Sequence, residues 1–125
     1  MPKPRILLAF DKRVRDRYVD DEQLARLEKY ADWDWFECEG GGIYEAPGDD
    51  SEYGKAFADK IGGYDGLIVC HGAPRLSPTV LDSASSLKIV GELEGDRFAA
   101  RIDLDACWKR GIRTVDTTNA SSYPV

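Results

Sequence analysis

The chain has 125 residues, which is long enough for one domain with a single hydrophobic core. Hydrophobic residues make up 42% of it and charged residues 32%, a composition typical of a soluble globular protein rather than a disordered or membrane-embedded one. The net charge is -6, and Lys and Arg are scattered among the acidic residues. Nucleic acid is therefore excluded as an expected partner, because binding to phosphates needs a basic face.

The first ten residues, MPKPRILLAF, begin with basic side chains, but their apolar run is too short for a signal peptide or a membrane span. We therefore expect a cytoplasmic protein without a membrane partner. Cys38, Cys70 and Cys107 are widely spaced and form no CxxC pair. This pattern favours reduced, buried thiols over a disulfide framework or a zinc site. The single histidine excludes a histidine-based metal cluster, and no metal site is predicted.

Hydrophobic runs and turn signals predict five strands that alternate with four helices. The first strand, 5–10, is a continuous apolar run, as expected of a parallel strand buried on both faces. The charged stretch 11–18 lacks periodicity and is predicted to be a loop. The further strands are predicted at 33–38, 65–70, 87–91 and 112–115, and the helices at 20–30, 51–61, 77–84 and 104–110.

Capping residues define the starts of three of these helices. Asp20 or Asp21, Ser77 followed by Pro78, and Asp103 can each accept hydrogen bonds from the first helical turn. The three tryptophans are expected to be packing residues, and the last helix is expected to turn Trp108 inward with its neighbours. The tryptophans are Trp33, Trp35 and Trp108.

The β-α-β-α-β-α-β-α-β order predicts an α/β fold, most simply a flavodoxin-like three-layer sandwich with a five-stranded parallel sheet in the order 2-1-3-4-5. Open sheets of this kind bind ligands at the carboxyl ends of their strands. We therefore expect a site in the loop after the fourth strand. The loop after the third strand, which begins at His71, occupies a similar position.

Two functions that use such a sheet are excluded by their chemistry. A phospho-receiver domain needs an acidic pair after strand one, an aspartate ending strand three and a lysine ending strand five. The corresponding places here hold Asp11 alone, Cys70-His71 and Asp116-Thr117. A flavodoxin needs a phosphate loop rich in hydroxyls and glycine, where this chain has AFDKRVRD.

Two stretches carry a more specific pattern. DGLIVCHGAPRLSPTVLDSASSLKIVG, followed by IDLDACWKRGIRTVDTTNASSYPV, resembles the N-terminal part of the D-isomer-specific 2-hydroxyacid dehydrogenases. That family typically has a "DGL-hV-R" strand, a helix ending near "LKhVG", a glycine-rich loop and "D-hDhpAA-cRGI-V-NT". The anchors here are Leu87-Lys88 and Arg110-Gly111-Ile112, in the same order. Residues 2–63 are similar to the family only in the order of their predicted strands and helices.

The resemblance implies that 1–119 form the substrate-binding (catalytic) domain and that 120–125 begin the helix crossing to a missing NAD-binding domain. Full-length relatives transfer hydride between NAD(H) or NADP(H) and a 2-hydroxy or 2-oxo acid, the small-molecule partner. Their GxGxxG fingerprint and their catalytic arginine, carboxylate and histidine belong to the absent part. The chain alone is therefore expected to be an inactive fragment that holds no cofactor and no catalytic residue.

In the family, backbone amides after strand four cradle the substrate carboxylate, and glycines leave room for it. Here Glu92 stands at the usual arginine position and Glu94 at a usual glycine position, so carboxylates would repel an anionic substrate. Arg97 or Arg101 would offset this charge, since a guanidinium binds carboxylates bidentately. The predicted substrate-binding residues are His71, Gly72, Ala73, Glu92, Leu93, Glu94, Gly95 and Arg97, and the predicted cofactor-binding residues are Thr118 and Asn119.

Plainer roles stay open for some of these residues. His71 is either a substrate contact or a strand-end side chain hydrogen-bonded to a neighbouring carbonyl, and it is not the family's catalytic histidine. Thr118 and Asn119 lie either at a hinge beside the cofactor or at the cap of the next helix. A second hypothesis, motivated by the altered loop, is a stand-alone module that binds small acids or another protein and has lost catalysis.

Overall fold

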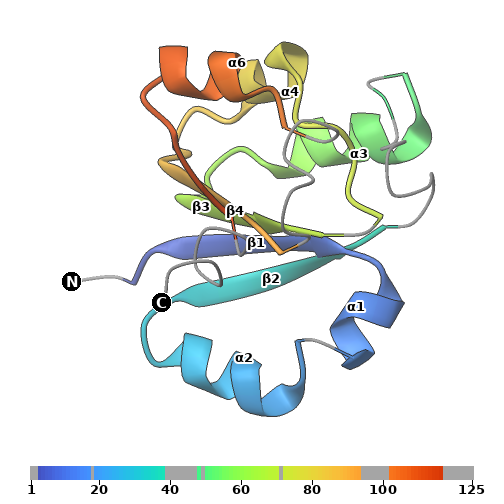
Figure 1. The fold of residues 1–125 in the computed structure, drawn as a ribbon, viewed down its shortest axis with the longest axis vertical. Helices are drawn as coiled ribbons and strands as arrows, with labels where there is room; N and C mark the ends of the chain where they lie inside the picture. The colour runs from blue at the N-terminus through green and yellow to red at the C-terminus, as the bar shows by residue number, and fades with distance from the viewer. Residues whose placement is uncertain are drawn as a thin grey trace, which may run out of the picture.

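A computed structural model of the chain describes residues 3–17, 19–38, 48, 50–70, 72–93 and 102–116 (Figure 1). Within these residues, one sheet carries helices on both faces. The elements are β1 (Arg5–Phe10), α1 (Lys12–Arg17), α2 (Asp21–Glu28), β2 (Asp32–Glu37), α3 (Glu52–Lys60), β3 (Gly66–Val69), α4 (Pro78–Ser83), β4 (Ile89–Glu92), α6 (Leu104–Lys109) and β5 (Arg113–Asp116).

The sheet has five parallel strands in the order β2-β1-β3-β4-β5, which confirms the predicted topology. Helices α1 and α2 lie on one face of the sheet, and α3, α4 and α6 lie on the other (Figure 1). Parallel strands need such helical connections, because a chain must return along a face of the sheet before it can add another strand in the same direction.

The predicted helix caps are confirmed. The backbone N–H groups of the first turns donate to Asp20, Ser77 and Asp103 at 3.0, 3.3 and 3.0 Å. Each cap satisfies an N–H group that has no partner within its own helix. The start of these helices is therefore determined locally, which is why the predicted and observed bounds differ by only a few residues.

The prediction of a loop over 11–18 was wrong, because helix α1 occupies most of this stretch. Asp11 caps it by accepting the Val14 N–H at 2.9 Å, and the Val14 side chain is buried in the core. The guanidinium of Arg15 donates to the Val19 carbonyl at 2.9 Å and lies 5.8 Å from the ring centre of Trp35. A helix held by one apolar side chain and one long cation has no hydrophobic periodicity to detect.

The apolar core is divided by the sheet into two clusters. Leu7 and Ala9 of β1 point into the larger cluster, beneath α3, α4 and α6, whereas Leu8 and Phe10 point into the smaller one. This alternation follows from the two-residue period of a strand. All four side chains are at most 1% exposed, so β1 is buried on both faces, as its apolar run predicted.

The tryptophans do not share one role. Trp33 and Trp35 are half-buried against the smaller cluster, as expected. The inward placement of Trp108 was wrong: it is 57% exposed, and its indole N–H donates to Thr114 at 3.1 Å. Short helix α6 buries Ala106 and Cys107, and the next residue along a helix points about 100° away.

All three cysteines are free and buried, in agreement with the sequence analysis. Cys107 on α6 has the most informative environment. Burial, and after it the charge of Asp103, raises the pKa of the Cys107 thiol to about 11 from an ordinary value of 9.0, while Arg110 opposes the shift. The folded protein therefore holds this proton more tightly than the unfolded chain does.

This difference predicts a loss of stability in alkali. The contribution of Cys107 is complete below about pH 9, the pKa in the unfolded chain, and is lost as the pH rises toward 11. Between pH 7.5 and 10.5, the free energy of unfolding of the natural protein should fall by roughly 2 kcal/mol more than that of Cys107→Ala, as measured by urea titration. Equal losses in the two proteins would show that Cys107 does not titrate in this range.

Candidate functional site

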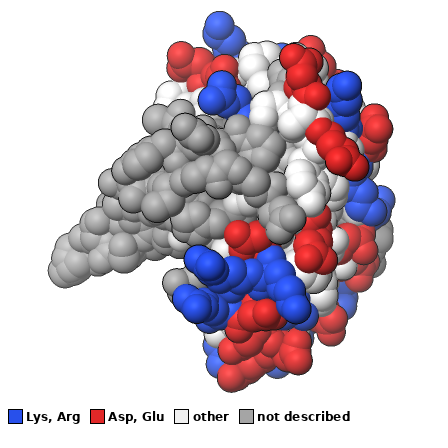
Figure 2. All heavy atoms as spheres, turned by 90° about the vertical axis from the view of Figure 1, so that its right-hand side faces the viewer, with Lys and Arg blue, Asp and Glu red and all other residues white. Residues whose placement is uncertain are grey.

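The candidate site lies at the carboxyl edge of the sheet, the right-hand side of Figure 1, which faces the viewer in Figure 2. Because all five strands are parallel, their carboxyl ends meet there. The described residues at this edge follow four of the strands. They are Asp11 and Lys12 after β1, Cys38 after β2, Cys70, Gly72 and Ala73 after β3, and Leu93 after β4.

Gly72 joins the ends of three strands. Its φ of +92° lies in the left-handed region that favours glycine. A Cβ atom at this position would lie 2.7 Å from the carbonyl oxygen of Cys38 and 2.9 Å from the Cβ of Asp11. The loop after β3 thus packs directly against the ends of β1 and β2. The close approach that requires glycine here is to the protein's own chain.

Ala73 continues this loop into the core. Its side chain is fully buried in the larger cluster, and its N–H donates to the Cys70 carbonyl at 3.1 Å. The adjacent Gly72 and Ala73 therefore form a tight turn that anchors the end of β3. Their predicted contact with substrate stays a prediction.

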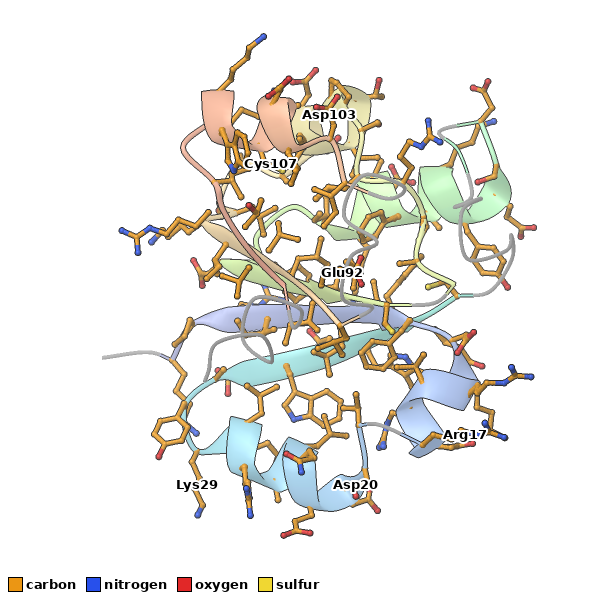
Figure 3. All side chains as sticks on the ribbon, in the orientation of Figure 1. Arg17, Asp20, Lys29, Glu92, Asp103 and Cys107 are labelled. Atoms are coloured by element: carbon orange, nitrogen blue, oxygen red, sulfur yellow. The ribbon has the colours of Figure 1, made fainter. Side chains whose placement is uncertain are left out.

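Glu92 is the most unusual residue of the edge, because it is a carboxylate that is only 1% exposed. It ends β4, in register with Val69 of β3 and Asp116 of β5. It lies on the same side of β4 as the buried Val90, and Figure 3 places it between the sheet and the upper helices. Burying a carboxylate costs free energy unless polar groups compensate it, so Glu92 makes greater demands on its surroundings than an apolar residue would.

Leu93 extends β4 beyond its last residue. Its N–H donates to the Val69 carbonyl at 3.0 Å, and its side chain is 36% exposed. The structure thus brings Gly72, Ala73, Glu92 and Leu93 to the ends of two neighbouring strands, as the sequence analysis predicted. The remaining predicted site residues lie outside the described residues: His71, Glu94, Gly95, Arg97, Thr118 and Asn119.

A hollow at the ends of β1 and β2 was not predicted. It has a volume of about 310 Å³ and is lined by Lys12, Glu37, Cys38 and Tyr53. An ammonium, a carboxylate and a phenol suit a small polar ligand. The strand-end rule points to Lys12 and Glu37, but Tyr53 comes from α3 and could be placed here only by the tertiary fold.

Lys12 belongs to a helix that carries further exposed cations. Helix α1 carries Lys12, Arg13 and Arg17, all exposed, and Figure 2 shows basic side chains grouped on this face of an otherwise acidic protein. For these three side chains, the described part of the chain provides no salt bridge. The β1 side of the edge therefore presents these cations beside the exposed carboxylates of Asp16 and Glu37, whereas β4 ends in the buried Glu92.

A second hollow, of about 340 Å³, lies at the amino edge and is lined by Lys3, Glu28, Ala31, Asp32 and Trp33. Its polar groups hold one another: the Lys3 ammonium donates to the Glu28 carbonyl, and the Trp33 indole N–H donates to the Glu28 carboxylate at 3.2 Å. These contacts join the end of α2 to the start of β2 and to the residue Lys3 that precedes β1. We assign this hollow a structural role.

The described residues contain neither a metal-binding cluster nor a membrane-spanning helix. No group of three or more histidine, cysteine, aspartate or glutamate side chains is arranged there to hold a metal ion. No helix among the described residues has the length and apolar character needed to cross a bilayer.

No protein-family model and no curated protein matches the sequence significantly. Solved structures do share the fold. They include a putative D-3-phosphoglycerate dehydrogenase from Ralstonia solanacearum (18% identity, TM-score 0.62), covering 91% of this chain and 30% of that one. A phosphoglycerate oxidoreductase from Rhizobium etli has 22% identity, TM-score 0.61, and coverages of 92% and 31%. One from Vibrio cholerae O395 has 13% identity, TM-score 0.62, and coverages of 90% and 31%.

These comparisons confirm the fold that the resemblance implied. Nearly the whole chain superposes on parts of these three oxidoreductases. The chain spans about 30% of the length of those proteins. The likeness is therefore one of fold, between this chain and one part of each of those longer chains.

The contact at Gly72 yields a testable prediction. Gly72→Ala should lower the free energy of unfolding by the strain of a left-handed alanine, about 1–2 kcal/mol, and by a further ~1–3 kcal/mol for the clash with the Cys38 carbonyl. Gly111→Ala is the matched control, because Gly111 has a φ of +75° but nothing within 4 Å of an added Cβ. Urea unfolding of both variants measures the difference, and equal destabilisation would contradict the packing role of Gly72.

Proposed function

We propose that this chain is the substrate-side lobe of an NAD(P)-dependent oxidoreductase that acts on the CH–OH group of 2-hydroxy acids and reduces 2-oxo acids in the reverse direction. The observation that carries the proposal is the coincidence of fold and motif. The chain has the fold of solved phosphoglycerate oxidoreductases. The family-like anchors lie at defined places in that fold, with Leu87-Lys88 leading into β4 and Arg110-Gly111-Ile112 leading into β5.

The described residues do not fit a dinucleotide cofactor. Binding of a pyrophosphate needs glycines between the first strand and its helix, whereas Asp11 and Lys12 follow β1 directly. Gly72 is a poor substitute, because the space beside it is filled by Cys38 and Asp11. In the proposal, NAD or NADP is therefore bound by a further domain, with 1–119 as the substrate domain and 120–125 as the start of the crossover helix in a cytoplasmic enzyme.

The role of this lobe would be to bind and orient the acid. The ends of β3 and β4 would supply backbone N–H groups to the substrate carboxylate, as in the family pattern. Glu92 departs from that pattern, because an ionised carboxylate repels an anion where a guanidinium would attract it. Positive charge at this edge comes from Lys12 and its neighbours on α1. An anion bound at the end of β1 would have to contact the Lys12 ammonium directly, because the Glu37 carboxylate lines the same hollow and opposes attraction from a distance.

The test compares two polypeptides: the 125-residue chain and the longest polypeptide that its gene encodes. The longer protein should oxidise NADH or NADPH in the presence of a panel of small 2-oxo acids, followed by the loss of reduced-cofactor absorbance. The 125-residue chain should show no turnover, because its described residues do not fit a dinucleotide cofactor. A gene without a GxGxxG segment after this region, or a longer protein inactive toward every acid, would contradict the proposal.

A second candidate is a stand-alone module that binds small acids, and the hollow lined by Lys12 and Tyr53 favours it, because these residues all belong to this chain. Under this proposal the 125-residue chain binds 2-oxo acids without NAD(H).

Lys12→Met should weaken the affinity for 2-oxo acids about tenfold, which is the effect of losing one charge-assisted hydrogen bond. Calorimetry measures it. Lys29→Met is the matched control, since Lys29 is exposed beyond α2, before the amino end of β2 (Figure 3).

If Lys12→Met and Lys29→Met have the same affinity as the natural chain, the ligand does not use the hollow. Absence of any acid binding would reject this second candidate while leaving the first open to its own assay.

A further inference from the structure

The hollow at the ends of β1 and β2 is lined by two side chains of opposite charge that do not pair with each other. Lys12 is the first residue of α1, and Glu37 is the last residue of β2. Both are exposed, and neither forms a salt bridge within the part of the chain that the structure describes. The hollow therefore offers one positive and one negative group to a ligand.

The charged and the uncharged walls of the hollow come from opposite sides of the sheet. Side chains alternate along β2, so that Trp35 packs in the smaller cluster, on the side of α1, and Cys38 in the larger one. Glu37 has the parity of Trp35 and thus shares the side of α1 with Lys12 (Figure 1). Tyr53, from α3 on the other side, is half-buried against the larger cluster. A ligand at the end of β2 would meet charge on one side and a thiol and a phenol on the other.

The backbone around the hollow is fixed by hydrogen bonds of the fold itself. Lys12 and Tyr53 each stand in the first turn of a capped helix, where Asp11 and Ser51 each accept a backbone N–H at 2.9 Å. Glu37 belongs to a strand that is paired along its whole length with β1. Binding of a ligand therefore does not need to order these segments, and this saves part of the free energy that association costs.

Charge determines which class of small ligand suits this hollow. A simple carboxylate is attracted by Lys12 but repelled by Glu37. A simple amine is attracted by Glu37 but repelled by Lys12 and by the exposed Arg13 beside it. An uncharged ligand would displace water from both charged groups without replacing its hydrogen bonds. Only a ligand that carries both charges gives each of the two side chains an opposite partner.

The size of the hollow restricts the ligand further. Its volume of about 310 Å³ is that of roughly ten water molecules in the liquid, so the ligand must be small. The smallest common molecules that hold a carboxylate and an ammonium close together are the amino acids. Cys38 and Tyr53, which line the other wall, add no further charge for a charged ligand side chain. An amino acid with a small uncharged side chain is therefore the best match.

We propose that this hollow binds a small amino acid, whose carboxylate contacts the Lys12 ammonium and whose ammonium contacts the Glu37 carboxylate. The inference rests on the second candidate function only in placing a ligand in this hollow, and it changes the class of ligand from an acid to a zwitterion. In the proposed oxidoreductase the substrate lies at the ends of β3 and β4. The amino acid would there be a second ligand of the same lobe, bound at the ends of β1 and β2, and not the substrate.

The first test compares three matched probes on the natural 125-residue chain. L-Alanine carries both charges, pyruvate carries the carboxylate alone, and ethylamine carries the ammonium alone. Titrations followed by backbone amide NMR shifts measure even millimolar affinities. L-Alanine should bind at least tenfold more tightly than either other probe, because each of these lacks one charge-assisted hydrogen bond. Pyruvate binding as tightly as L-alanine would overturn the inference and keep the second candidate function, whereas absence of binding by all three would reject both.

Two variants then test the role of each charge. Lys12→Met should weaken the binding of L-alanine and of pyruvate about tenfold. Glu37→Gln should weaken the binding of L-alanine about tenfold but strengthen that of pyruvate, because the repulsion is removed. Opposite effects of one variant on two ligands cannot come from a loss of folding, and both side chains are exposed.

Asp105→Asn is the matched control for Glu37→Gln, since Asp105 is an exposed carboxylate on α6, which packs against β5 at the other end of the sheet. It should leave both affinities unchanged. If Glu37→Gln weakens both ligands, or changes L-alanine binding no more than Asp105→Asn does, Glu37 does not hold the ammonium and the inference is wrong. These assays contain no cofactor, so their outcome does not depend on whether a longer protein oxidises NAD(P)H.

Discussion

The architecture depends on the burial of β1 on both of its faces. Leu7 and Leu8 are adjacent residues that point to opposite sides of the sheet, and neither is more than 1% exposed. A strand of this kind must have strands on both edges and helices on both faces, because its backbone and its side chains all need to be removed from water. The order β2-β1-β3-β4-β5 meets the first requirement. Helices α1 and α2 below, with α3 above, meet the second at β1.

Most of this architecture could be predicted from the sequence, because its signals are local. An apolar run identifies a doubly buried strand, and Asp20, Ser77 and Asp103 each start a helix through a bond to a residue three positions further along. The errors arose where contacts between distant parts of the chain, rather than local sequence, determine the secondary structure. Helix α1 depends on Val14 reaching the core and on Arg15 lying against Trp35, a residue from another strand.

The place of the candidate residues in the fold was predictable, but their surroundings were not. The strand-end rule placed Gly72 and Glu92 at the carboxyl edge, where the structure has them. The sequence could not show what approaches Gly72, because glycine is equally required beside a bound ligand and beside the protein's own backbone. Tyr53 was missed for a different reason: it reaches the end of β2 from α3, and no short-range pattern connects the two. Contacts between elements are the information that the sequence alone lacks.

The electrostatics of the edge limit where an anionic ligand can lie. The charge of an ionised Glu92 would act at close range through protein rather than water, where the effective dielectric constant is low and screening by salt is weak. Lys12 is exposed, so water and salt screen its attraction for an anion more strongly than they screen a buried charge. The ammonium therefore stabilises a bound anion only by direct contact. An anion at the end of β1 is therefore held only if it enters the hollow and touches the Lys12 ammonium. A small ligand bound at this edge would thus be selected by the fit of one small polar hollow rather than by a broad basic surface.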